Sequence, residues 1–317
     1  MVSGGKSLRV GSRLEWVLEN GYFAVTTEIA PPASASPDDI RAFAALFRGV
    51  ADAVNVTDCQ RALVKISSFG GSILAMQEGV EPIMQMVLRD RNRIALQADL
   101  LGAAALGVRA ILCLRGDDPK VGNEKDATGV FDLNTEEMIG MFRTLRDTGT
   151  LRGGDKVDVP PNFLIGAAAN PLGGNLEQSF ANLRGKVTAG ADFIQTQAIY
   201  DVDAFEEWMR LVRKEWLHEK VHILAGVIPL RSPKMAHFLA EKVPGIVIPK
   251  FIMERMETAP DPKAEGMSIA LRTIKALRKV EGVRGVHIMA INWDEIVPIL
   301  AKEAGLLPRP AMPPSPL

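Results

Sequence analysis

Short apolar runs recur along the whole chain, and most of them are continuous rather than alternating. Continuous runs of this length are typical of strands that are buried on both faces, as in a parallel sheet. The pattern therefore predicts eight parallel strands, at residues 23–29, 53–58, 82–88, 108–115, 162–169, 191–200, 221–228 and 285–292.

Amphipathic segments with helix start and stop signals separate these runs. The stretch SPDD at residues 36–39 combines a capping residue, a first-turn proline and early acids, and the segment 89–107 ends in glycine. Further helices are expected to begin at Thr135, Asn175, Asp201, about Lys263 and near Trp293. Strands that alternate with helices in this way predict an α/β fold, a single-domain (β/α)8 TIM barrel.

An open, doubly wound sheet is the alternative arrangement of the same elements. That fold usually places the glycine pattern GxGxxG after its first strand, and this chain has no such pattern there. The barrel is expected to span residues 21–307. Residues 1–20 are expected to form an N-terminal extension or helix, and residues 308–317 a proline-rich tail.

Composition and charge narrow the class of protein. The 317 residues are 47% hydrophobic and carry a net charge of −1, which gives no electrostatic reason to expect nucleic acid or a membrane as partner. No apolar run approaches the roughly 20 residues that cross a bilayer, so we expect a cytoplasmic protein. The two cysteines, Cys59 and Cys113, predict neither a disulfide framework nor a metal site within the chain.

Polar residues near the carboxyl ends of the predicted strands are the candidates for chemistry, because barrel active sites form there. Glu28 lies in an apolar run before two prolines, where an ionised carboxylate is costly without a partner. Asp117 follows Gly116, which lets a ligand approach the backbone closely. Both carboxylates are therefore expected to be functional, whereas Asp118 precedes a proline and is expected to cap a turn.

Three polar side chains within predicted strands have two interpretations each. Gln195 and Gln197 lie two residues apart, so they point to the same side of a strand. Each belongs either to a polar layer inside the barrel or to a functional site. His287 also lies within a strand, and a hydrogen-bonded core histidine is the interpretation we expect for it.

Seven motifs occur in order between about residue 20 and residue 300: TTEIAPP, VNVTD, RDRNRIALQADLLGAAALG, LRGDDP, KVTAGADFIQTQAIYD, AGVIPL and VPGIVIP. Together they resemble the methylenetetrahydrofolate reductase family in its short, catalytic-domain-only prokaryotic form. The resemblance implies a (β/α)8 flavoprotein of one-carbon metabolism, usually with FAD. Such an enzyme reduces 5,10-methylenetetrahydrofolate to 5-methyltetrahydrofolate after a donor has reduced the flavin.

The resemblance also implies roles for individual residues. Glu28 matches the acid that helps to open the five-membered ring of the folate, and burial that raises its pKa suits this task. Asp117 matches an aspartate near both flavin and pterin, and Gln197 matches a pterin-binding glutamine. Met289 stands where a tyrosine helps to hold folate. The implied flavin contacts are Thr57, Gln85, Leu114, Arg115, Gly116, Asp117, Ala168, Asn170, Lys186 and Ala191.

Several departures from the family pattern leave alternatives open. Pro233 stands where members that use a nicotinamide donor commonly carry an aromatic residue, so NAD(P)H is not settled as the donor. Gln85 and Asn170 replace a histidine and a tyrosine, so FMN is an alternative to FAD. The departures resemble reductases of anaerobic one-carbon metabolism, some of which receive electrons from a separate zinc- or iron–sulfur-containing subunit.

The partners expected for this chain are therefore methylenetetrahydrofolate and such an electron-delivering subunit, in a homo- or hetero-oligomer. Two other functions remain open. One is a pterin-binding methyltransferase, which needs no flavin. The other is a flavin-holding subunit of a larger electron-transfer complex.

Overall fold

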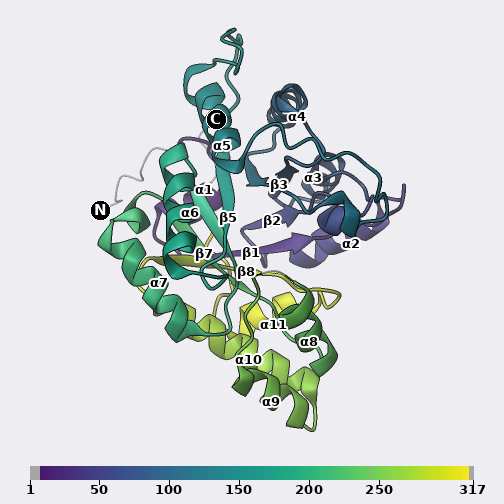
Figure 1. The fold of residues 1–317 in the computed structure, drawn as a ribbon, viewed down its shortest axis with the longest axis vertical. Helices are drawn as coiled ribbons and strands as arrows, with labels where there is room; N and C mark the ends of the chain where they lie inside the picture. The colour runs from purple at the N-terminus through teal and green to yellow at the C-terminus, as the bar shows by residue number, and fades with distance from the viewer. Residues whose placement is uncertain (1–7, 244, 314–317) are drawn as a thin grey trace.

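Eight parallel strands close into a barrel in the order β1 to β8 (Figure 1). The computed structural model describes residues 8–243 and 245–313 of the chain. The predicted (β/α)8 barrel is confirmed. Its strands are β1 Ala24–Ile29, β2 Ala53–Val56, β3 Pro82–Val87, β4 Ala110–Leu114, β5 Leu164–Ala169, β6 Phe193–Ala198, β7 His222–Val227 and β8 Val283–Ile288.

Helices surround the barrel, with α2 to α4 on one side and α8 to α10 grouped at another (Figure 1). The helices are α1 Arg13–Glu19, α2 Asp38–Phe47, α3 Ser68–Gln77, α4 Arg93–Ala105, α5 Thr135–Thr148, α6 Leu176–Ala189, α7 Val202–Lys214, α8 Pro233–Lys242, α9 Lys250–Thr258, α10 Pro262–Leu277 and α11 Ile296–Glu303. Helices α3, α8 and α9 were not predicted from the sequence, and α11 begins at Ile296, a few residues after the predicted start near Trp293.

Side-chain caps explain several of the helix starts. Asn134 accepts a hydrogen bond from Glu137 N at 2.8 Å, and the Glu137 carboxylate accepts one from Asn134 N at 2.9 Å, which together form a capping box for α5. Asn175 caps α6 and Asp201 caps α7 in the same position. Each cap satisfies backbone N–H groups that have no partner within the helix.

The strands alternate between two cores. One set of side chains fills the barrel interior: Ala24, Ala53, Ile83, Ala110, Leu112, Leu164, Phe193 and Leu224. Their neighbours along the strands, such as Val25, Val54 and Met84, pack outward among the helices. A Cβ atom at Gly166 would lie 2.2 Å from the Phe193 ring, so the glycine makes room for this ring in the interior.

Helix α1 fills the amino-terminal end of the barrel. Its residues Leu14, Val17 and Leu18 belong to the same cluster as the interior side chains of the strands. The carboxylate of Glu81, which precedes β3, accepts hydrogen bonds from Arg13 N at 2.6 Å and Leu14 N at 3.1 Å at the start of this helix. The opposite, carboxyl-terminal end is therefore the one where a site can form.

The first residues of the predicted proline-rich tail return under the barrel. Arg309 lies close to the fully buried carboxylate of Asp52, at 2.5 and 3.1 Å, and donates to Phe23 O at 2.8 Å. Arg13 also pairs with Asp52 at 3.0 Å. The remaining parts of the two predicted terminal segments, residues 1–7 and 314–317, lie outside the described residues.

Two features are absent from the described part of the chain. None of its helices is both long enough and apolar enough to cross a membrane. Within the same residues, no group of three or more His, Cys, Asp and Glu side chains is placed to hold a metal ion.

Candidate active site

Most of the predicted site residues surround the carboxyl-terminal opening of the barrel. By the alternation of the strands, five of them point inward, two or four residues beyond interior side chains: Glu28, Thr57, Gln85, Leu114 and Ala168. Gln197 lies at an irregularity in the pairing of β6 with β7, and Met289 follows β8 and packs against the apolar cluster of α8 to α10. Arg115, Gly116 and Asp117 follow β4 directly, and Asn170 follows β5. The strand ends thus bring residues from distant parts of the sequence to one rim.

Glu28 lines a cavity of about 270 Å³ between the segments that follow β1, β2 and β8. Its side chain is only 21% exposed. The pKa of Glu28 is raised to about 7: burial is the largest cause, the nearby Asp294 also raises it, and Lys65 partly opposes both. A carboxyl group with this pKa can both give and take a proton near neutral pH.

Glu28 also lies beside a buried polar layer inside the barrel. His287 Nε2 is 4.0 Å from Glu28 Oε2, and His287 Nδ1 is 3.0 Å from Thr26 Oγ1. Asn55 and Gln195 exchange two amide hydrogen bonds, of 2.6 and 3.0 Å. Gln195 therefore belongs to a polar layer of the barrel, and His287 is a hydrogen-bonded core histidine as predicted. Burial lowers the pKa of His287 to about 3, so the ring is neutral.

The two adjacent aspartates after β4 have different contacts. Asp117 Oδ2 accepts a hydrogen bond from the backbone N–H of Arg61 at 2.8 Å. Asp118 accepts one from Lys120 N at 2.9 Å and caps the 3-10 helix Pro119–Val121, as predicted for a turn. Only Asp117 therefore extends across to the segment that follows β2.

Strained backbone marks that segment after β2. Cys59, Arg61 and Ala62 have φ angles of 45°, 58° and 53°, which side chains other than glycine rarely adopt. A Cβ atom at Gly122 would lie 1.8 Å from Ala62 O, so the segments after β2 and β4 pack backbone to backbone. This close packing holds the Arg61 N–H against Asp117.

Lysine and asparagine side chains meet near the end of β5. Lys186 Nζ donates to Ala168 O at 2.8 Å and to Asn182 Oδ1 at 2.6 Å, and burial lowers its pKa. Asn170 Oδ1 is buried and has no hydrogen-bond partner among the residues that the structure describes. A buried amide oxygen without a partner is costly, which makes it a natural contact for a ligand donor.

Ala191 is not brought to this rim. It lies in the turn between α6 and β6, before the amino end of the strand, and donates its N–H to Lys186 O. The predicted flavin contact at Ala191 is therefore wrong in its placement, because a residue that precedes a barrel strand lies at the opposite end from the site. The residue is buried and packs in the core.

Two charged residues near Glu28, Lys65 and Asp294, were not among the predicted site residues. Both line the same cavity as Glu28. Asp294 follows β8 by a few residues, so the rule about strand ends could have found it. Lys65 lies nine residues beyond β2, and only the path of that segment brings it to the rim.

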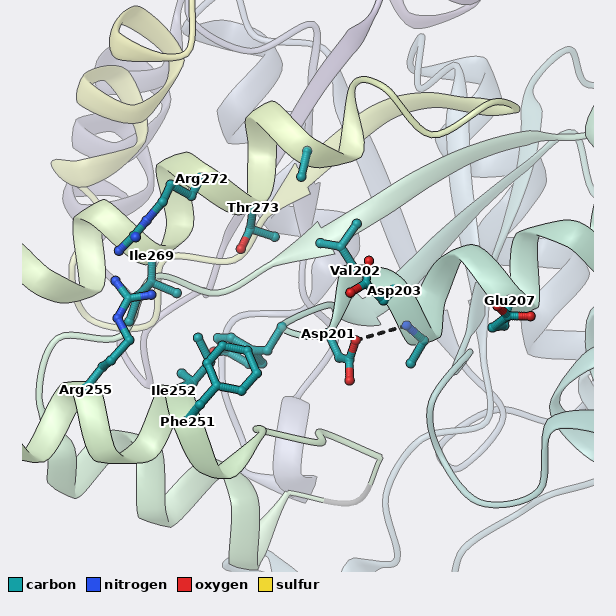
Figure 2. A pocket seen from close by; sticks show the side chains of 13 residues that line it. Asp201, Val202, Asp203, Glu207, Phe251, Ile252, Arg255, Ile269, Arg272 and Thr273 are labelled. Atoms are coloured by element: carbon teal, nitrogen blue, oxygen red, sulfur yellow. Dashed lines mark hydrogen bonds between the residues drawn. The ribbon is translucent and has the colours of Figure 1, made fainter.

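A larger cavity, of about 560 Å³, lies outside the barrel between α7, α9 and α10 (Figure 2). Figure 2 shows Arg255 and Arg272 on one side of it, Phe251 in the middle and Asp201 and Asp203 beyond. Its acids and bases are largely engaged elsewhere: Asp201 caps α7, and Arg255 pairs with Glu265. None of the predicted site residues lines this cavity, so the rim around Glu28 is the candidate active site.

Comparisons with known proteins agree with the fold. The chain is 25% identical over 236 residues to methylenetetrahydrofolate reductase 1 of Schizosaccharomyces pombe, a match that covers 72% of this chain and 36% of the relative. It is also 25% identical over 238 residues to the 5,10-methylenetetrahydrofolate reductase of Salmonella typhimurium, covering 73% and 72%. The match thus spans about a third of the fission yeast relative.

A solved structure shares the barrel at low sequence identity. It is an uncharacterised protein from Clostridium thermocellum that binds two copies of 5-methyl-5,6,7,8-tetrahydrofolic acid. The TM-score is 0.62 at 15% identity, and the match covers 93% of this chain and all of that one. At this identity the likeness concerns the fold alone.

A family model covers nearly the whole barrel. The model of methylenetetrahydrofolate reductase matches residues 13–305, from α1 to just beyond α11. The matched range includes every strand and all the residues described around the carboxyl-terminal rim. This chain therefore belongs to the methylenetetrahydrofolate reductase family.

Proposed function

We propose that the protein reduces 5,10-methylenetetrahydrofolate to 5-methyltetrahydrofolate in a flavin-dependent reaction. The observation that carries the proposal is Glu28, a carboxyl group in a confined cavity at the barrel opening with a pKa of about 7. A group with that pKa is suited to give a proton to a weakly basic nitrogen. Membership of the reductase family supports the same reaction.

The rim offers a surface that fits a flavin. Thr57, Gln85, Leu114 and Ala168 come from four neighbouring strands and point inward beside one another. Apolar Leu114 and Ala168 suit the face of a flat ring, and the amide of Gln85 suits its polar edge. Asn170 Oδ1 is buried without a hydrogen-bond partner among the described residues, so a turn of this side chain toward the rim would let it accept a hydrogen bond from the cofactor.

Charged residues beside that surface complete the proposed flavin site. The guanidinium of Arg115 lies over the Phe131 ring, with Cζ 4.3 Å from the ring centroid, which holds the side chain near Gly116 and the rim. Arg115 and Lys186 supply positive charge for the ribityl or phosphate groups. A bound flavin supplies the hydride for reduction of the folate.

The remaining residues act on the folate. Glu28 gives its proton to N10, and N10 takes the electron pair of the methylene–N10 bond as that bond breaks. Asp117 accepts N–H groups of the pterin in the way that it now accepts the Arg61 N–H. Gln197, in β6, is proposed to bind the pterin amide, and Met289, which follows β8, is proposed to contact the folate.

We propose FAD as the flavin, with FMN as the alternative, and either NAD(P)H or a separate metal-containing subunit as the electron source. Release of the cofactor from purified protein, followed by mass spectrometry, identifies the flavin. Anaerobic addition of NADH, NADPH and reduced ferredoxin in turn identifies the donor from the loss of flavin absorbance.

The direct test of the proposed function mixes protein containing reduced flavin with methylenetetrahydrofolate in the absence of oxygen. Reoxidation of the flavin together with formation of 5-methyltetrahydrofolate is expected. A flavin that stays reduced contradicts the proposal. A colourless protein that binds methyltetrahydrofolate would instead indicate a pterin-dependent methyltransferase, and activity that needs a co-purifying subunit would indicate a flavin-holding component of a complex.

A further inference from the structure

A line of hydrogen-bonded side chains crosses the barrel interior and ends beside Glu28. It begins with the amide pair of Asn55 and Gln195 and continues through Thr26 to His287. All four residues are buried. Buried polar chains of this kind hold their members in one arrangement, because each unsatisfied group would be costly.

The donors and acceptors of this chain fix its direction. Asn55 Nδ2 donates to Gln195 Oε1 at 2.6 Å, and Gln195 Nε2 donates to Asn55 Oδ1 at 3.0 Å. The second hydrogen of Gln195 Nε2 is then directed at Thr26 Oγ1, 3.3 Å away. The Thr26 hydroxyl accepts this bond and keeps its own hydrogen for another acceptor.

That acceptor is the ring of the histidine. Thr26 Oγ1 lies 3.0 Å from His287 Nδ1, closer than the 3.4 Å to Val286 O. Gln195 Nε2 also approaches the same ring nitrogen, at 3.5 Å. Both hydrogens of Gln195 Nε2 are already used, so the Thr26 hydroxyl is the donor to Nδ1, which leaves the single hydrogen of the neutral ring on Nε2.

The Nε2 hydrogen faces Glu28. The distance from His287 Nε2 to Glu28 Oε2 is 4.0 Å, and the partly exposed glutamate side chain can close it by rotation. The other charged groups that face Glu28 are Asp294, after β8, and Lys65, in the segment after β2. Neither of these belongs to the buried chain, so His287 is the group that the barrel interior itself presents to the carboxylate.

We propose that His287 is a positioning residue for Glu28: its Nε2–H, held by Thr26, Gln195 and Asn55, orients the carboxyl group and stabilises the carboxylate that remains after proton transfer. The inference rests on the proposed function. In the step concerned, the proton moves from Glu28 to folate N10, and the methylene–N10 bond breaks with its electron pair on N10. The histidine gains or loses no proton; it donates a hydrogen bond throughout.

Substitution at His287 tests this role through the pH dependence of folate reduction by prereduced protein. In the native protein the rate falls as the pH rises through the pKa of Glu28, because the acid must be protonated. His287→Leu removes the donor, so the pKa at which the rate falls should rise by about one to two pH units. The rate of folate reduction at pH values below that pKa should fall about tenfold or more. This pH-dependent fall in rate is called the alkaline limb below. His287→Gln keeps an N–H near the Nε2 position and should retain a limb close to that of the native protein.

Other outcomes would overturn the proposal. An unchanged limb in His287→Leu would show that the histidine does not act on Glu28. Equal loss of rate in both variants without a shift of the limb would indicate a structural role only. Flavin content and reduction of the flavin by dithionite, which do not involve Glu28, should be the same in all three proteins.

A second measurement does not depend on folding of the leucine variant. Nitrogen NMR of ¹⁵N-histidine-labelled native protein, with His287→Gln used to assign the signal, should show the Nε2–H form of a neutral ring between pH 6 and 8. An Nδ1–H form or a charged ring would overturn the proposal. If reduced flavin is not oxidised by folate at any pH, the proposed function fails, whereas the NMR signal still decides the arrangement of His287.

Discussion

At the scale of single residues, neighbours in the sequence have unlike contacts. Asp117 reaches the backbone of Arg61 across the rim, whereas Asp118 stays within its own turn and caps it. In the motif LRGDDP, Asp117 is therefore directed at the site, whereas Asp118 shapes the loop. Only the structure shows the first contact, but the proline after Asp118 indicates the second.

The two aspartates form a matched test. Asp117→Asn should weaken folate binding by about tenfold to a hundredfold, because an amide replaces one charge-assisted acceptor with a weaker one. Asp118→Asn keeps the capping geometry and should leave binding within about twofold. Titration of both variants with 5-methyltetrahydrofolate measures the difference. Equal affinities would remove Asp117 from the proposed pterin contacts.

At the scale of elements, the segments that follow β2 and β4 form one closely packed unit. The positive φ angles at Cys59, Arg61 and Ala62 are maintained because Gly122 lets the two backbones approach. This unit carries both Asp117 and the Arg61 N–H that it binds. The shape of the rim thus depends on a glycine that has no chemical role.

Adding a methyl group at Gly122 tests this dependence. Gly122→Ala should force the two segments apart, lower stability by about 1–3 kcal/mol and weaken folate binding. Gly140→Ala is the matched control: this glycine lies within α5 with no atom near the added Cβ, and the change should stabilise the protein by about 0.5–1 kcal/mol. Urea unfolding and folate titration of both variants would contradict the account if Gly122→Ala behaved like the control.

The strands and most helices could be predicted from the sequence because their signals are local. Continuous apolar runs gave all eight strands, and capping residues such as Asn175 and Asp201 gave helix starts. Helix α3 was missed because its sequence SFGGSILAMQ has two glycines and no clear apolar stripe. The approach of Lys65 and Asp294 to Glu28 joins three strand ends across the barrel opening, and no local pattern encodes it.

At the scale of the whole molecule, the barrel is closed at its amino end and joined to both flanking segments there. The fully buried Asp52 carboxylate accepts from Val25 N at 2.9 Å and pairs with Arg13 and Arg309. Arg309 is itself only 5% exposed. One side chain thus connects β1, α1 and the start of the C-terminal tail, at the end of the barrel away from the site.

Loss of this connection should affect stability rather than chemistry. Asp52→Ala leaves the Arg309 guanidinium buried without its partner and should lower the free energy of unfolding by about 3–5 kcal/mol. Adding Arg309→Met to Asp52→Ala should recover a large part of the loss, because the uncompensated charge is removed. Urea unfolding measures both effects. If Asp52→Ala alone were as stable as the native protein, the proposed stabilising role of the Asp52–Arg309 pair would be contradicted.

Single-turnover kinetics of prereduced protein test whether Glu28 supplies the proton for folate reduction. The native protein should oxidise its flavin with methylenetetrahydrofolate at a rate that falls as the pH rises through about 7, the pKa to which burial raises Glu28. Glu28→Gln should bind flavin normally yet reduce folate at least a hundredfold more slowly, with no such limb. A Glu28→Gln protein that retained the native rate and the same pH dependence would contradict the claim.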